Sequence, residues 1–143
     1  EKLYRKALEI SPGTPIASNN LAWMMADQNR GNLDEALRLA QDTADKNQKV
    51  AGFYDTLGWV NYKRKFYSRA IGSFKKAVAL EEAQARADGR APNPGYRLRL
   101  GMALAASGDK NSGRKEVAIA LKNGGNNFSS KEIQAAKSVL AGS

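Results

Sequence analysis

One pattern of small and large apolar residues recurs along this chain at a spacing of 34 residues or slightly more. Ala36 and Ala70 occupy equivalent places 34 residues apart, and Leu21 and Leu57 occupy equivalent places 36 residues apart. Periods of about 34 residues are typical of stacked helix–turn–helix units, because each unit exposes an apolar face that only its neighbour covers. The repetition therefore predicts an all-α chain built from pairs of helices.

The middle copy holds the pattern in its fullest form, and weaker copies lie on both sides of it. Its recurring residues are Leu57, Gly58, Asn61, Tyr62, Ala70, Ile71, Phe74 and Ala77. The preceding copy has Leu21, Ala22, Met25, Ala36, Leu37 and Ala40. The following copy has Leu100, Gly101, Leu104, Gly113, Val117 and Ala120, shifted by nine residues that the polar stretch 85–93 supplies. Small residues at fixed places permit close helix–helix approach, and large ones fill the space between the helices.

Residues 51–84 resemble a tetratricopeptide (TPR) repeat at nearly every marker position. The remaining segments resemble weaker repeats (15–50 and 94–127), a half repeat (1–14), an insertion (85–93) and a capping helix (128–143). The resemblance implies one TPR-like domain, an α-solenoid of antiparallel helix pairs wound into a right-handed superhelix with a C-terminal capping helix. It also implies that the chain forms the C-terminal repeats of a larger bacterial multi-TPR protein. One departure from the family is Gly113, where alanine is expected.

Local signals indicate where the helices begin. The predicted starts are Thr14-Pro15, Asn32 with Glu35, Asn93-Pro94, and Ser129 with Glu132. Each start pairs a capping side chain with a residue suited to the first helical turn. The helix that follows Ser129 is expected to cover the open apolar edge of the last repeat, as the ends of solenoids require. We expect its outward side to carry Lys131, Gln134 and Lys137.

The composition restricts the chemistry that this chain can perform. It contains no cysteine and no histidine, which removes thiol catalysis, the commonest general base and the commonest metal ligand. No cluster of Asp and Glu offers carboxylate catalysis or an oxygen-ligated metal site. No apolar run approaches the roughly 18 residues of a membrane span. We therefore expect no catalysis, no cofactor and no membrane span in this chain, and its cellular location stays unassigned.

The net charge of +9 is unevenly distributed. Residues 1–47 carry six Lys or Arg against seven Asp or Glu, and residues 48–143 carry seventeen against seven. The run Lys63-Arg64-Lys65 is interleaved with Tyr62, Phe66, Tyr67 and Arg69, as in some nucleic-acid patches. These aromatic residues fall in packing places of the repeat, so nucleic acid is not the expected partner. Binding of an anionic ligand by the basic C-terminal half is one alternative function.

The TPR resemblance implies a binding face, because the first helix of each repeat lines the concave side of such solenoids. The residues carried over to this groove are Asn19, Trp23, Asp27, Asp55, Trp59, Lys63, Leu98, Arg99 and Met102. Trp23 and Trp59 hold equivalent places and are candidate anchors for a peptide, since Trp combines a large apolar area with a hydrogen-bond donor. The alternative is that both indoles are packing residues. One TPR subclass grips a partner's terminal carboxylate, but of its positions only Arg99 matches here.

The resulting functional hypothesis is a non-catalytic protein-interaction scaffold. Its partner would be a peptide or protein segment bound in the concave groove. The residue pattern of the repeats resembles that of bacterial TPR proteins, some of which serve envelope or export assemblies. A second alternative is a structural module in which another copy of the chain fills the groove, giving a homo-oligomer.

Overall fold

The computed structural model describes residues 14–28, 32–124 and 128–142, and every regular element in these ranges is a helix. The helices are α2 (Pro15–Asp27), α3 (Leu33–Lys46), α4 (Ala51–Lys63), α5 (Tyr67–Asp88), α6 (Gly95–Ala106), α7 (Lys110–Gly124) and α8 (Ser130–Leu140). The predicted half repeat over 1–14 lies outside the described residues, apart from Thr14.

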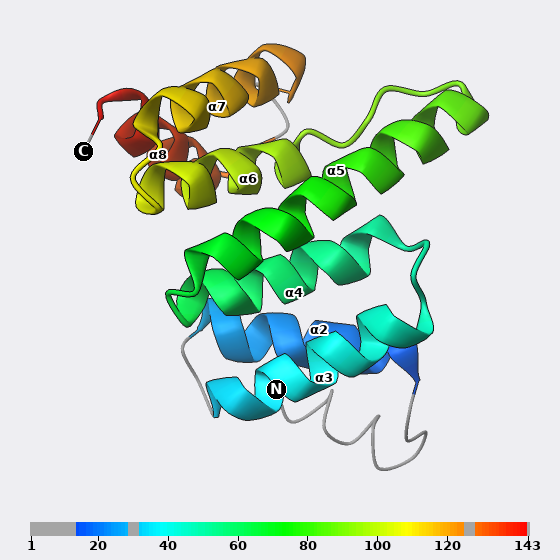
Figure 1. The fold of residues 1–143 in the computed structure, drawn as a ribbon. Coiled ribbons are helices and arrows are strands. Elements are labelled where there is room, and N and C mark those ends of the chain that lie inside the picture. The colour runs from blue at the N-terminus through cyan, green and yellow to red at the C-terminus, as the bar shows by residue number, and fades with distance from the viewer. Residues whose placement is uncertain (1–13, 29–31, 125–127, 143) are drawn as a thin grey trace.

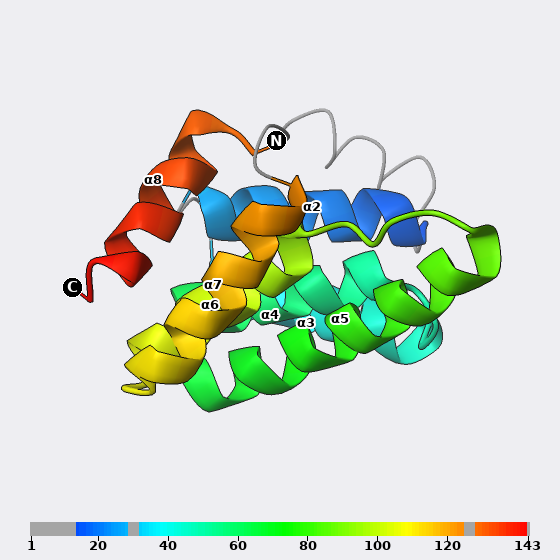
Figure 2. The same cartoon turned by 90° about the horizontal axis from the view of Figure 1, so that it is seen from above.

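The helices form three successive hairpins, and each hairpin packs on the next (Figure 1). The pairs are α2 with α3, α4 with α5, and α6 with α7, while α4 also contacts α2 and α6. After the last pair, α8 packs against α7 and α6, and the view from above shows it at one end of the stack (Figure 2). The predicted all-α solenoid with a closing helix is confirmed.

Asn32 and Ser129 make the capping bonds that the sequence indicates, whereas Thr14 occupies the N-cap position of α2 without a side-chain capping bond. The Asn32 side chain accepts a hydrogen bond of 2.8 Å from the Asp34 N–H and caps α3. At α8 both bonds of a capping box are present, since Ser129 Oγ accepts from the Glu132 N–H at 3.1 Å and Glu132 Oε1 accepts from the Ser129 N–H at 2.9 Å. Capping bonds satisfy N–H groups that the first helical turn leaves without partners.

The start of α6 differs by one residue from the prediction. The helix begins at Gly95 with Pro94 in the N-cap position, whereas the sequence pattern placed Asn93 there. The Asn93 side chain still accepts a hydrogen bond of 2.9 Å from the Gly95 N–H. Proline lacks a donor and can occupy either place, so the capping function stays with Asn93 although the boundary moves.

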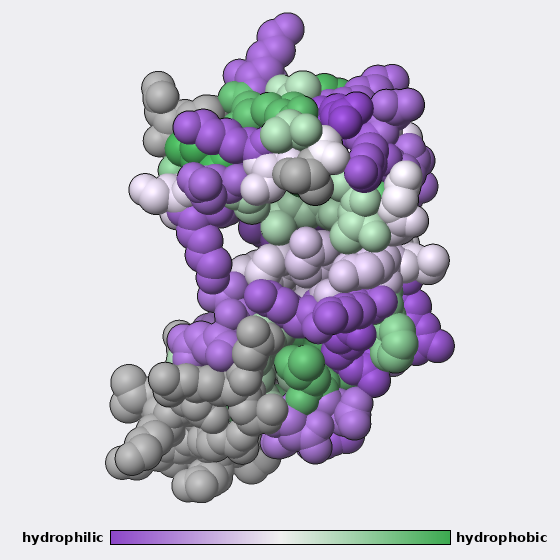
Figure 3. Space-filling view, turned by 90° about the vertical axis from the view of Figure 1, so that its left-hand side faces the viewer, coloured by the Kyte–Doolittle hydropathy of each residue, from purple (hydrophilic) through white to green (hydrophobic). Residues whose placement is uncertain are grey.

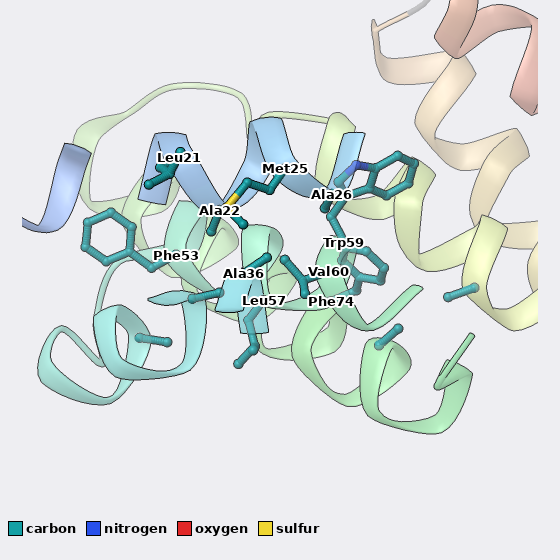
Figure 4. Close-up of a cluster of buried hydrophobic side chains, with 14 of the residues drawn as sticks. Leu21, Ala22, Met25, Ala26, Ala36, Phe53, Leu57, Trp59, Val60 and Phe74 are labelled. Atoms are coloured by element: carbon teal, nitrogen blue, oxygen red, sulfur yellow. The ribbon is translucent and has the colours of Figure 1, made fainter. Parts of the chain in front are cut away.

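Two clusters of buried side chains hold the hairpins together. The larger joins α2, α3, α4, α5 and α6, and Figure 4 shows labelled side chains of the first four of these helices pointing toward one another. Its fully buried members include Leu21, Met25, Val60 and Phe74. The smaller cluster consists of Leu98, Val117, Ala120, Ala136 and Val139, and it fixes α8 to the α6–α7 hairpin. Buried side chains therefore join each hairpin to the next, as expected of a solenoid.

The unexpected Gly113 has a packing explanation. A Cβ atom at this position would lie 2.7 Å from the Gly101 carbonyl oxygen and 2.9 Å from the Ala105 backbone nitrogen. The backbones of α6 and α7 therefore approach more closely here than an alanine at 113 would permit.

The polar stretch 85–93 divides between helix and loop. Helix α5 continues through Asp88 and so includes the first residues of this stretch, and Gly89 terminates it with a left-handed φ of 68°. The returning loop is fastened to α5 by Glu81, whose carboxylate accepts bonds of 2.6 and 3.2 Å from the Arg90 guanidinium. The same carboxylate accepts a 2.7 Å bond from the Asn93 N–H. Glu81 thus sets where α6 begins.

We expect Glu81→Gln to lower the free energy of unfolding at neutral pH by about 1–2 kcal/mol, because charge-assisted bonds of a buried carboxylate are lost. The Arg90 hydrogen bond holds the pKa of Glu81 below its ordinary value of 4.5. This stabilisation is therefore complete above pH 4.5 and is lost as the pH falls through the lower folded pKa. Urea unfolding of both proteins between pH 7 and 3 measures the effect.

Asp42→Asn provides the control, because Asp42 is an exposed carboxylate whose ion-pair partner among the described residues is the exposed Lys46. The stability of the Glu81→Gln variant should fall less steeply with acid than that of the parent. Equal slopes for all three proteins would show that Glu81 does not hold the loop.

Candidate functional site

Aromatic side chains from successive hairpins stack into a continuous row. The rings of Trp23 on α2 and Trp59 on α4 stack with centroids 5.5 Å apart and planes at 19°. Trp59 stacks in turn on Tyr62 at 5.2 Å and 6°, and Tyr62 meets Tyr67 edge to face at 5.6 Å. Trp23 and Trp59 come together because they occupy the same place in consecutive repeats. We refer to Trp23, Trp59 and Tyr62 as the aromatic row.

A cation lies over each of the two indoles. The Arg99 guanidinium of α6 is 5.2 Å from the centroid of the Trp23 ring, and Lys63 Nζ is 5.1 Å from that of Trp59. Such contacts use the negative electrostatic potential of the indole face. They orient both cationic side chains along the inner helices.

A buried ion pair joins α4 to α6 beside the aromatic row. Arg99 Nε donates a 2.7 Å bond to Asp55 Oδ1, and its NH1 group lies 3.5 Å from Glu132 Oε2 of α8. Asp55 is only 5% exposed, and burial raises its pKa above the ordinary value although Arg99 partly offsets this. Burial would lower the pKa of Arg99, but the carboxylates of Asp55 and Glu132 hold it above its ordinary value. Arg99 therefore links three helices and is already occupied, which disfavours a terminal-carboxylate clamp.

An apolar pocket of about 220 Å³ opens between the inner helices and α8. Its lining consists of Trp23, Asp27, Trp59, Leu98, Arg99 and Met102 from α2, α4 and α6, with Ser129, Lys131, Glu132 and Ala135 from the α8 segment. Lys131 Nζ lies 3.6 Å from Asp27 Oδ1 across the pocket. Lys131 was expected on the outward side of the last helix, and its side chain is indeed 74% exposed, but it also borders the pocket because α8 lies across the end of the groove.

A more polar depression of about 300 Å³ adjoins this pocket. It is lined by Asn19, Asn20, Trp23, Gly52, Asp55, Thr56, Asn93, Tyr96 and Arg99. Trp23 and Arg99 border both hollows, so the two form one continuous surface, which we call the groove. The groove thus has an apolar end under α8 and an amide-rich end at the start of α2.

The structure brings the nine predicted groove residues together, although not equally at the surface. Eight line the two hollows, and Lys63 lies over Trp59 at the other side of the aromatic row. Leu98 is completely buried and Trp59 is only 7% exposed, so both support the groove from below. Trp23 and Met102 are half-buried and present apolar surface to the pocket.

The repeat pattern missed the contribution of α8 and of Tyr96. The pattern places residues within each hairpin, but it does not indicate how the terminal helix α8 packs against the last hairpin. Glu132 was recognised only as a capping residue, and its contact with Arg99 comes from its other carboxylate oxygen. Tyr96, which lies at 5.9 Å from the Arg99 guanidinium, is three residues before it on α6. That one-turn spacing was a signal available in the sequence.

Within the part of the chain that the structure describes, no group of three or more Asp or Glu side chains could hold a metal ion. None of the helices in those ranges combines the length and apolarity needed to cross a bilayer.

Comparison with solved structures defines the class of fold. The type III secretion translocator chaperone SycD of Yersinia enterocolitica is similar with a TM-score of 0.71 and 18% identity, over 93% of each chain. SycD in complex with a peptide of the translocator YopD gives 0.70 and 18%, over 93% of this chain and 94% of that one. YrrB, a TPR protein with an unusual peptide-binding site, gives 0.68 and 20%, over 96% of this chain and 64% of its own.

No protein-family model matches the chain. No curated protein matches it by sequence. The structural likenesses show a TPR-like helical-repeat fold.

Proposed function

We propose that this chain is a non-catalytic protein-interaction module that binds a peptide segment in the groove. The observation that carries the proposal is the apolar pocket between Trp23, Met102 and α8, which opens beside polar side chains suited to main-chain recognition. Pockets that combine apolar walls with a few polar groups are the usual form of a binding site.

The two ends of the groove indicate what the peptide would contain. An apolar cavity of about 150 Å³ holds a benzene molecule, so the pocket of about 220 Å³ accommodates one large apolar side chain. At the other end the amide group of Asn20 can bond to peptide N–H and C=O groups, and the Nδ2 groups of Asn19 and Asn93 can donate to peptide C=O groups. Two structurally similar proteins support this proposal, because SycD was solved with a bound peptide of the translocator YopD and YrrB has a peptide-binding site.

A role in a bacterial envelope or export assembly remains a finer proposal. It is supported by the likeness to SycD, which is a type III secretion translocator chaperone.

Selection of peptides from a displayed random library, followed by calorimetric titration of the selected peptides, tests the groove. We expect them to share one large apolar residue. Trp23→Ala and Met102→Glu should each weaken binding at least about tenfold, because anchor contacts in a desolvated pocket dominate affinity. Lys122→Gln, an exposed substitution on α7, should leave the affinity unchanged.

Peptides whose affinity is the same for the groove variants and the parent would contradict the proposal. So would a concentration-dependent dimer that Met102→Glu abolishes, since a second copy of the chain would then fill the groove. Sedimentation of the parent and of Met102→Glu at several concentrations distinguishes this case.

A further inference from the structure

The turn between α4 and α5 carries an exposed aromatic residue among cations. Residues 63–69 contain four Lys or Arg and no Asp or Glu. Phe66 was assigned to packing from the repeat pattern together with Tyr62 and Tyr67, but it is 45% exposed, whereas the two tyrosines contact each other. We call Arg64, Lys65, Phe66, Ser68 and Arg69 the turn patch.

Two guanidinium groups lie over the Phe66 ring. The Arg64 guanidinium lies 4.5 Å from the ring centroid and that of Arg69 lies 5.7 Å from it. Arg64 also bonds to Asp34 at 2.9 Å, which neutralises its charge locally. Lys65 and Arg69 are exposed and form no ion pair with any other described residue. The patch therefore offers an aromatic surface beside two uncompensated positive charges.

The patch is hollowed, and it lies where one helix ends and the next begins. A depression of about 400 Å³ is lined by Lys65, Phe66, Tyr67, Ser68, Arg69 and Ser107. It lies at the N-terminus of α5, where the first turn has no acidic residue and Phe66 makes no side-chain capping bond. Helix N-termini carry partial positive charge, but α4 ends at the same turn and its C-terminus carries the opposite partial charge, so the positive potential comes from the side chains.

Lys65 occupies a backbone position that favours glycine. Its φ is +66°, and it is the sole non-glycine residue with positive φ among the described residues. The Lys65 N–H donates to the Tyr62 carbonyl and the Phe66 N–H donates to the Asn61 carbonyl, which is the bonding of a Schellman helix end. A lysine here costs conformational energy that a glycine would not. The strained position projects a cation at the edge of the depression.

We propose that the turn patch is a second docking surface, which binds an acidic protein segment containing an aromatic or large aliphatic residue. The apolar residue packs on Phe66, and the neighbouring carboxylates face Lys65, Arg69 and the start of α5. Nucleic acid is the less suitable occupant, because affinity for a phosphate backbone rises with the number of phosphates neutralised, and within the turn patch only Lys65 and Arg69 lack an ion-pair partner among the described residues.

This surface is separate from the groove. None of its residues lines either hollow of the groove. The turn lies on the left-hand side of Figure 1, and the view of that side in Figure 3 shows many hydrophilic side chains. The two sites can therefore be tested independently.

Fluorescence anisotropy with a labelled peptide, Gly-Glu-Asp-Phe-Glu-Asp-Gly, tests the proposal. Lys65→Gly and Arg69→Gln should each weaken binding about fivefold, and replacing the peptide's Phe with Ser should do the same. Lys65→Gly should unfold at or above the parent temperature, which separates a binding effect from a folding effect. Lys75→Gln removes an exposed charge elsewhere on α5 and should change binding less than about twofold.

Trp23→Ala in the groove should leave binding of the acidic peptide unchanged. Equal losses for Lys75→Gln and Arg69→Gln would overturn the proposal, because attraction to net charge alone would then explain binding. Tighter binding of single-stranded oligothymidylate, reduced by the same patch variants, would also overturn it and identify a nucleic-acid site. No measurable binding of the peptide at low salt would refute the docking surface.

Discussion

Trp59→Ala is expected to lower the free energy of unfolding by about 3–5 kcal/mol, because it removes a large side chain from a position where the structure cannot collapse. The indole is 7% exposed, belongs to the main core cluster and stacks on Trp23 on one side and Tyr62 on the other. Its loss leaves a cavity between α2 and α4 and interrupts the aromatic row. Urea unfolding followed by circular dichroism at 222 nm measures the change without relying on tryptophan fluorescence.

Trp23→Ala is the matched comparison, because it removes the same side chain from the same stacked pair. Trp23 is half-buried and borders the pocket, so we expect a loss of only about 1–2 kcal/mol, from one stacking contact and partial burial. The difference between the two stability losses would distinguish the roles of the indoles, with Trp59 supporting the groove from below and Trp23 available to a partner. Equal losses would assign both indoles to packing and leave Met102 as the main apolar surface of the pocket.

Gly101→Leu is expected to cost at least about 3 kcal/mol, at the upper end of the range for overpacked interfaces. A Cβ atom at 101 would lie 2.6 Å from Val117 Cγ2 and 2.8 Å from the Gly113 carbonyl oxygen. The second contact is with backbone, so a rotamer change cannot relieve it and the α6–α7 hairpin must open. Because α8 is fixed to this hairpin, the apolar pocket should be lost as well. Thermal unfolding and titration of a groove peptide would detect both effects.

Gly58→Leu should be destabilising for a related reason, since a Cβ there would lie 2.6 Å from Phe74 Cε1 in the core. Gly72 provides the opposite case, because a Cβ there meets no atom within 4 Å on an exposed part of α5. Gly72→Ala is expected to stabilise the chain by about 0.5–1 kcal/mol through helix propensity. A wild-type melting temperature for Gly101→Leu would mean that the helix register between α6 and α7 is wrong.

The helical architecture could be predicted from the sequence because its determinants are local and repeated. The 34-residue period specifies helix pairs, and capping residues such as Asn32 and Ser129 satisfy N–H groups within their own first turn. Trp23 and Trp59 could be placed together for the same reason, since equivalent positions of stacked repeats are neighbours in space.

The detail of the groove depends on contacts between residues far apart in the chain. Asp55 and Arg99 pair across 44 positions, and no local rule indicates that Arg99 faces Asp55 rather than a partner's carboxylate. Whether Phe66 was buried or exposed depended on how the α4–α5 turn meets its neighbours, and the repeat pattern assigned it to the wrong environment.

The sequence by itself determined the helix pairs, their order and the equivalent places of the two indoles in consecutive repeats, because propensity, capping and apolar periodicity act within one or two repeats. Only the tertiary structure decided that α8 leans across the groove, that Lys131 reaches Asp27, and that Trp59 is buried while Trp23 remains partly exposed. Those features follow from how whole helices pack against one another. A packing angle is set by the sum of many side-chain contacts rather than by any single residue's preference.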